Sequence, residues 1–127
     1  MGAAHLRLAL ARDAGDARRA RSYVRRVCTA FDPEVVTTAE LLTTELFSNA
    51  LKHGTGPIML NVSLDDELLR VEVSDTSPGV PVVGRPGPED ASGRGLFLVE
   101  ALAREWGVAR FPHSAGKVVW FTLDVAA

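Results

Sequence analysis

The sequence contains almost no cysteine and no excess of charge of either sign. Cys28 is the single cysteine among 127 residues, which excludes an internal disulfide and a cysteine-based metal cluster and suits a reducing compartment. Because Cys28 falls within an amphipathic segment, we expect a small buried side chain rather than a nucleophile. Fourteen Lys and Arg residues against sixteen Asp and Glu residues give a net charge of -2. No global positive field therefore favours nucleic acid or anionic lipid.

Long apolar runs are also absent. Residues 1–11 alternate polar and apolar side chains, unlike a signal peptide, and no later stretch is long enough to span a membrane. A chain of this size can bury roughly two thirds of its unfolded surface, which is enough for one real core. We therefore expect a single cytoplasmic domain over residues 1–127, with no direct contact to membrane or nucleic acid.

The first half of the chain has the periodicity of one strand and two helices. Residues 5–11 alternate with period two and predict a strand whose apolar side carries Leu6, Leu8 and Leu10. Residues 16–31 follow helical spacing with an arginine-rich outer face, and Asp13 or Asp16 offers an N-cap. That arginine face is either solvated or a docking surface for an acidic partner. A second helix is predicted from residue 33 to Gly54, with proline in its first turn.

The second half predicts a proline-rich loop between strands. Residues 58–64 and 68–74 read as strands joined by a hairpin at 65–67, and residues 108–111 and 117–125 as closing strands joined by a turn at 112–116. Four prolines and four glycines fill residues 78–93, which indicates a loop that closes over a ligand. A third helix is expected over 95–104. The element order predicts an α+β two-layer sandwich, with a mixed, mostly antiparallel sheet of about five strands and three helices on one face.

The second predicted helix carries a polar row beside its apolar stripe. Glu45, Asn49 and His53 are four residues apart, so each lies within about 40° of the previous one around the helix. An amide oxygen from Asn49 suits Mg²⁺, and a carboxylate one turn away can orient or deprotonate an attacking hydroxyl. Glu45 could also be an exposed helix carboxylate, and His53 either faces the helix dipole or contacts phosphate. A zinc site from Glu45, His53 and a distant aspartate is a weaker alternative.

Two further features lie on either side of the proline-rich loop. Asp75 ends an apolar strand, so it either initiates a turn or accepts a hydrogen bond from the exocyclic amine of adenine. Gly93, Arg94 and Gly95 precede an apolar helical run, an arrangement in which backbone N–H groups and the helix dipole bind phosphate. Arg94 adds a positive charge near that phosphate or is solvated.

In this order the pieces resemble the Bergerat-fold (GHKL) ATP-binding superfamily, which includes DNA gyrase, heat-shock chaperones and sensor histidine kinases. Glu45 through His53 is similar to the N box, Asp75 through Gly79 to the first glycine box, and Gly93 through Leu96 to the second. The small size, the strand before the N box and the form of both glycine boxes most resemble bacterial anti-sigma-factor serine/threonine kinases. Those proteins bind a sigma factor and phosphorylate a small antagonist protein.

The resemblance implies specific roles and cofactors. ATP and Mg²⁺ would be bound, with Glu45 as general base, Asn49 as metal ligand and Asp75 as the carboxylate that reads adenine. Nucleotide would be accommodated by the backbone turns at Gly79, Gly93 and Gly95. The partners implied are a sigma factor and an anti-sigma-factor antagonist, and a homodimer is possible on the same ground.

The sequence departs from the family pattern at two places. Ser77 stands where the first box usually has glycine, so a left-handed backbone is not freely available there. Val118 occupies the place where a threonine often supports the adenine contact. Lys52 matches a histidine-kinase N box, in which this lysine reaches phosphate, but the chain has no helix pair with a phosphoacceptor histidine. The leading hypothesis is therefore a protein serine/threonine kinase. A non-catalytic nucleotide-dependent binding module and a detached histidine-kinase catalytic domain remain the alternatives.

Overall fold

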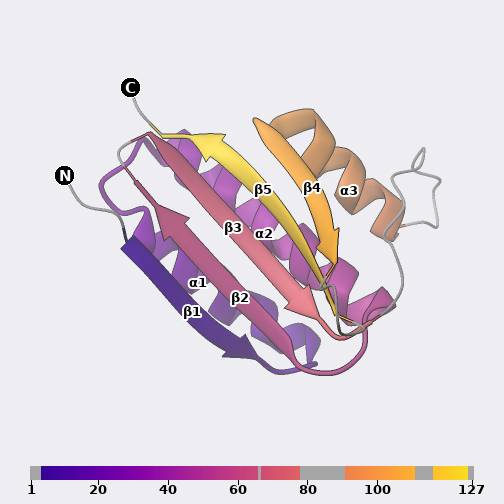
Figure 1. Ribbon diagram of the computed structural model, residues 1–127. Coiled ribbons are helices and arrows are strands. Elements are labelled where there is room, and N and C mark those ends of the chain that lie inside the picture. Colours follow the sequence, from indigo (N-terminus) through magenta and orange to yellow (C-terminus); the bar gives the residue numbers. More distant parts are fainter. Residues whose placement is uncertain (1–3, 66, 78–90, 111–115, 126–127) are drawn as a thin grey trace.

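A computed structural model describes residues 4–65, 67–77, 91–110 and 116–125. These form a five-stranded sheet in the order β1-β2-β3-β5-β4, with helices packed on one face (Figure 1). The elements in chain order are β1 (Ala4–Leu10), η1 (Ala14–Asp16), α1 (Ala17–Val27), α2 (Pro33–His53), β2 (Ile58–Leu64), β3 (Leu68–Asp75), α3 (Ala91–Leu102), β4 (Glu105–Arg110) and β5 (Lys117–Asp124). The predicted α+β two-layer sandwich is confirmed. Each of the described strand pairings is antiparallel, so the sheet is not mixed.

Helix α2 begins and ends at the residues that its sequence signals indicate. The Asp32 side chain accepts a hydrogen bond from the Glu34 backbone N–H at 3.0 Å, and Pro33 occupies the first turn. Gly54 caps the other end. Between them, Leu42, Leu46 and other apolar residues of α2 are buried against the sheet.

Helix α1 is shorter than its apolar spacing predicts. It ends at Val27, and a 3-10 turn, η1, precedes it. Asp13 caps η1 by accepting from Gly15 N–H at 2.9 Å. Asp16 stands at the N-cap position of α1, but its side chain binds the Ala11 N–H at 2.7 Å and pairs with Arg19. The arginine-rich face is therefore not simply solvated.

Two arginines of this face reach back to α2. Arg25 forms an ion pair with Glu40 at 2.8 Å, and Arg21 lies 3.4 Å from the Thr44 hydroxyl. Both pairs join α1 to α2. The two helices lie on the same side of the sheet in Figure 1, with α1 against β2 and α2 mainly against β3 and β5.

The strand register assigns alternate residues to opposite faces of the sheet. Leu8 pairs with Leu60 on the helix-covered face, as predicted for the apolar side of β1. That face holds the core, and Val71 and Phe121 are fully buried there. Burial decreases toward the free edge of β1, where Leu6 remains 42% exposed.

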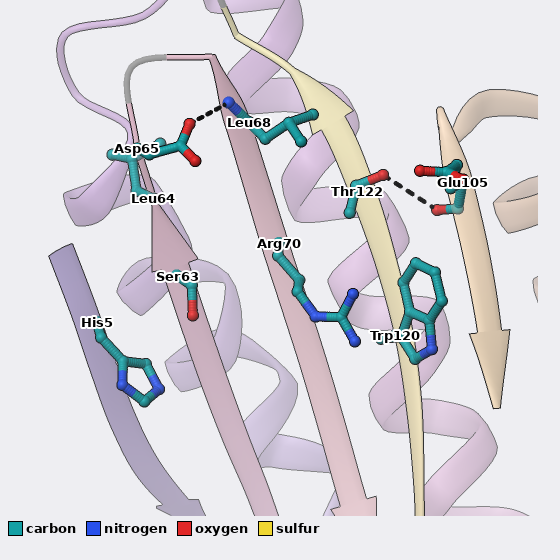
Figure 2. Close-up of a pocket in the computed structure, with 9 residues that line it drawn as sticks. All are labelled: His5, Ser63, Leu64, Asp65, Leu68, Arg70, Glu105, Trp120 and Thr122. Atoms are coloured by element: carbon teal, nitrogen blue, oxygen red, sulfur yellow. Dashed lines mark hydrogen bonds between the residues drawn. The ribbon is translucent and has the colours of Figure 1, made fainter. Parts of the chain in front are cut away.

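The opposite face of the sheet contains a hollow of about 470 Å³ (Figure 2). Arg70 lies at its centre, with its guanidinium 4.1 Å from the ring centroid of Trp120 and its Nε 2.8 Å from Glu72. The hollow is lined by His5, Ser63, Leu64, Asp65, Leu68, Arg70, Glu105, Trp120 and Thr122. Because Arg70, Trp120 and Thr122 face away from the helices, this hollow is separate from the polar row of α2.

Two boundaries in the second half differ from the prediction. Helix α3 begins at Ala91 rather than Gly95, so Gly93, Arg94 and Gly95 lie within its first turns instead of forming a turn before it. A helical glycine costs about 1 kcal/mol relative to alanine, and burial of Leu96 and Val99 in the core outweighs that cost. Strand β4 begins three residues before the predicted start at residue 108.

Several predicted features lie outside the described residues. These are most of the loop at 78–93, including Gly79, and most of the turn at 112–116. Within the described part of the chain, no helix is both long and apolar enough to cross a membrane.

Candidate functional site

The polar row of α2 passes from partly buried to exposed along the helix. Glu45 is half-buried, Asn49 is only 4% exposed, and Lys52 and His53 in the last turn are exposed. Helix α2 packs against α3 as well as against β3 and β5. The predicted row is thus a continuous line of polar side chains that leaves the core at the C-terminal end of the helix.

Asn49 has the properties of a residue that binds a ligand. Its Oδ1 atom is buried and has no hydrogen-bond partner among the described residues. Leaving a buried acceptor without a hydrogen bond costs roughly 1–3 kcal/mol, and most buried polar atoms in folded proteins therefore have a partner. A neutral amide oxygen is also a ligand that Mg²⁺ accepts. This single oxygen therefore fits a magnesium ion that is held otherwise by water and phosphate.

A zinc site is not supported. In the described ranges, no three His, Cys, Asp or Glu side chains lie close enough together to hold a metal ion. His53 and Glu45 therefore do not form a metal cluster with an aspartate there. Zinc would need such a set, because its protein sites use at least three ligands of this kind.

Asp75 and Lys117 form a buried ion pair at the end of the sheet nearest the C-terminus of α2. They are direct neighbours in the register of β3 and β5. The Lys117 ammonium lies 3.1 Å from Oδ1 and 2.9 Å from Oδ2 of Asp75, and each side chain is 2% exposed. Because β3 and β5 are antiparallel, the last residue of β3 and the first residue of β5 lie at the same end of the sheet.

Lys117 corrects the prediction for Val118. Val118 pairs with Ser74 on the face of the sheet that the helices do not cover, so it cannot support a contact to Asp75. The residue that faces Asp75 is Lys117, one position earlier. Alternation along β5 carries this signal: Val119 and Phe121 are core residues, which assigns Lys117 to the same side.

Ser77 is accommodated without a left-handed backbone. No non-glycine residue in the described ranges has a positive φ. The Ser77 backbone N–H donates to Asp75 Oδ1 at 2.7 Å, which is the two-residue turn that aspartate side chains favour. The turn after Asp75 is thus held by the carboxylate itself, and the missing glycine at position 77 imposes no strain.

Gly54 brings the end of α2 directly against Asp75. A Cβ atom at Gly54 would lie 2.6 Å from both Asp75 Cγ and the Ala50 carbonyl oxygen, so no larger residue fits without movement. One residue after Asp75, Thr76 is tied to the same loop, since its backbone N–H and its hydroxyl each donate to the Thr55 carbonyl at 3.0 Å. These contacts fix the carboxylate relative to the polar row.

Arg12 holds the loop from the other side. Its guanidinium donates to the carbonyl oxygens of Ala50, Leu51, Gly54 and Gly56 at 2.8–3.0 Å. The Ala50 carbonyl also accepts from Gly54 N–H, but most carbonyls at a helix C-terminus lack an intrahelical partner, and all lie at the negative end of the dipole, so a guanidinium fork suits this place. Among the described residues, it is thus the side chain of Arg12 that binds the last carbonyls of α2, a place where the sequence predicts His53 to face the helix dipole.

The second predicted glycine box lies at the start of α3. Gly93, Arg94 and Gly95 have helical backbones, and the first N–H groups of such a helix have no intrahelical acceptor. Leu96 is 1% exposed and belongs to the core. Phosphate binding by these backbone groups remains a prediction.

Arg12, Gly54, Gly56 and Lys117 were not found as site residues from the sequence. Gly56 has a φ of 72°, a conformation that favours glycine, and a Cβ atom there would collide with the side chain of Thr76, just after β3. In the sequence, the Gly-Thr-Gly run directly after α2 is the one signal that indicates a turn at this place. The contacts of all four residues are made with segments distant in the sequence.

The fold is an antiparallel α+β sandwich in which the candidate site lies along α2, beside the end of the sheet that carries Asp75. A family model for the histidine kinase-like ATPase domain matches residues 10–123. The chain belongs to this family.

The proteins that the chain resembles include the following two. An uncharacterised protein of Streptomyces coelicolor is 39% identical over 70 residues, which cover 51% of this chain and 67% of that protein. The structure of the RsbU and RsbW domains of Rv1364c from Mycobacterium tuberculosis aligns with a TM-score of 0.72 and 21% identity. That alignment covers 96% of this chain but 32% of the longer one, so it shows a shared fold.

Proposed function

We propose that this protein binds ATP with Mg²⁺ and transfers phosphate to a serine or threonine of a partner protein. The observation that carries the proposal is the buried, unpartnered Oδ1 of Asn49, one turn after the half-buried Glu45 on α2. Membership in the histidine kinase-like ATPase family supports it. Intact Glu45 favours catalysis over a purely nucleotide-dependent binding module.

Each residue of the proposed site has a distinct role. Asn49 would hold Mg²⁺ through Oδ1, and the bound ion would neutralise charge on the phosphates. Glu45 accepts the proton of the attacking hydroxyl. Asp75 accepts a hydrogen bond from the adenine amine, while Gly93, Gly95 and the N-terminal amides of α3 contact phosphate. Lys52, His53 and Arg94 add positive charge or donors near the phosphates, and Gly79 allows a turn around the nucleotide.

We further propose that the partners are a sigma factor, inhibited by direct contact, and an anti-sigma-factor antagonist, which is the phosphorylated substrate. The fold shared with the chain that contains an RsbW domain supports this choice. A homodimer belongs to the same proposal. The arginines of α1 that are free to meet a partner are candidates for the contact, and Arg18 is exposed there.

The test combines nucleotide binding with phosphate transfer. Purified protein is incubated with labelled ATP, Mg²⁺ and a candidate antagonist, and both retained nucleotide and phosphoserine are measured. Glu45→Ala should abolish transfer and leave ATP affinity within a few-fold. Asn49→Ala should remove the Mg²⁺ dependence of ATP binding. Binding without transfer in the wild type would favour the binding module, and loss of ATP binding in Glu45→Ala would make that carboxylate structural.

A further inference from the structure

A contribution to stability does not explain the buried ion pair of Asp75 and Lys117. Both side chains are 2% exposed, and withdrawing two charges from water costs several kcal/mol per ion, which their attraction offsets only in good geometry. Apolar residues of similar volume at such positions are often as stable or more stable. The rest of this sheet face follows that pattern, with Val73, Val119 and Phe121 beside the pair. The ion pair therefore calls for a reason other than stability.

After its hydrogen bonds to the described residues are counted, the ion pair still has an unused acceptor position and an unused donor. A carboxylate has about four lone-pair positions and an ammonium has three N–H groups. Asp75 accepts from Ser77 N–H and twice from Lys117 Nζ, which fills three of its positions. The same two contacts use at most two of the ammonium N–H groups. Among the described residues, the pair thus retains one acceptor position on Asp75 and at least one N–H on Lys117, on two residues that are direct partners in the strand register and carry no net charge together.

This pattern complements one edge of adenine. The exocyclic amine is a donor, and the adjacent ring nitrogen N1 is an acceptor. Guanine presents an acceptor and then a donor at the same two positions, so it would meet both groups of the pair with the wrong sign. A carboxylate alone tests only for the amine, whereas the pair tests for amine and ring nitrogen together.

We propose that Lys117 is a specificity-determining residue that donates a hydrogen bond to N1 of the bound adenine while Asp75 accepts from the amine. The inference rests on the proposed function, because it requires that ATP bind at this edge of the sheet. It adds a direct, charged donor to the base contact. The strand register supports the assignment, since Lys117 is the residue of β5 directly opposite Asp75.

The test removes the acceptor from the ligand instead of the donor from the protein. Binding of ATP and of 1-deaza-ATP, which has a C–H group in place of N1, is measured by calorimetry with Mg²⁺. A charge-assisted hydrogen bond contributes about 1.5–3 kcal/mol, so wild-type protein should bind 1-deaza-ATP roughly 10- to 100-fold more weakly. ATP lacking the N7 ring nitrogen, 7-deaza-ATP, is the matched ligand control and should bind within a few-fold of ATP.

Lys117→Met removes the proposed donor from the protein, so this variant should bind ATP and 1-deaza-ATP with equal affinity. Arg104→Met is the matched protein control: it breaks an exposed 2.9 Å pair with Asp124, at the opposite end of β5 from Lys117, and should keep the discrimination. The wild-type comparison alone is decisive if Lys117→Met fails to fold. Equal affinity of the wild type for both nucleotides overturns the role of Lys117, as does tighter ATP binding by Lys117→Met. Absence of any ATP binding by the wild type overturns the proposed function and this inference together.

Discussion

Replacing Arg12 tests whether one side chain holds the end of helix α2. The guanidinium makes four hydrogen bonds to backbone carbonyls, and all four donor–acceptor distances lie between 2.8 and 3.0 Å. Three of these bonds are exposed and one is partly buried, so water replaces much of what is lost. At roughly 0.5 kcal/mol for each bond, the low end of the usual range, Arg12→Met should lower the free energy of unfolding by about 2 kcal/mol.

Arg12→Lys should recover only part of this loss. Lysine keeps the positive charge near the C-terminus of the helix, which contributes about 0.3–1 kcal/mol. Its single ammonium cannot reproduce the planar fork that reaches several carbonyls at once. We therefore expect an intermediate stability for Arg12→Lys.

The free energy of unfolding of the wild type, Arg12→Met and Arg12→Lys is measured by urea unfolding followed by circular dichroism. For a chain of 127 residues, a loss of 2 kcal/mol corresponds to a decrease of about 7 °C in Tm. The slope of the urea dependence should not change, because the same surface is exposed on unfolding. Arg18→Met is the control, since Arg18 is an exposed arginine of α1. If Arg12→Met and Arg18→Met have the same stability, Arg12 does not hold the helix end.

Three other changes have defined outcomes. Gly54→Ala places a Cβ atom 2.6 Å from the Ala50 carbonyl oxygen and should cost about 1–3 kcal/mol in urea unfolding; a wild-type curve would contradict the packing against Asp75. Leu46→Ala should cost about 2–5 kcal/mol, because the side chain is 1% exposed in the core, and a loss below 1 kcal/mol would refute this. Burial raises the pKa of Cys28 from 9.0 to about 11, so the fold favours the neutral thiol and loses stability between those pH values. Wild-type protein should lose about 2–3 kcal/mol more than Cys28→Ala over that range, and parallel pH profiles would contradict the shift.

Local patterns predicted the helices and the polar row because their signals lie within a few residues of the structure that they determine. Asp32 caps the helix that begins at the next residue, and the spacing of Leu42 and Leu46 fixes which side of α2 is buried. That orientation places Asn49 beside the core. Where local signals conflicted, the boundaries were wrong. The glycines at 93 and 95 indicated a turn, but core packing of α3 extends the helix across them.

The sequence by itself determined the element order, the apolar faces and the position of Asn49 at the margin of the core, since each depends on periodicity along one segment. The tertiary structure alone decided how the edge around Asp75 is built. Lys117 is 42 residues from Asp75, and Arg12 is 38 to 44 residues from the carbonyls that it binds. Such contacts depend on strand register and on the packing of loops from distant segments. A shift of one residue in β5 would move Lys117 to the other face of the sheet and bring Val118 opposite Asp75.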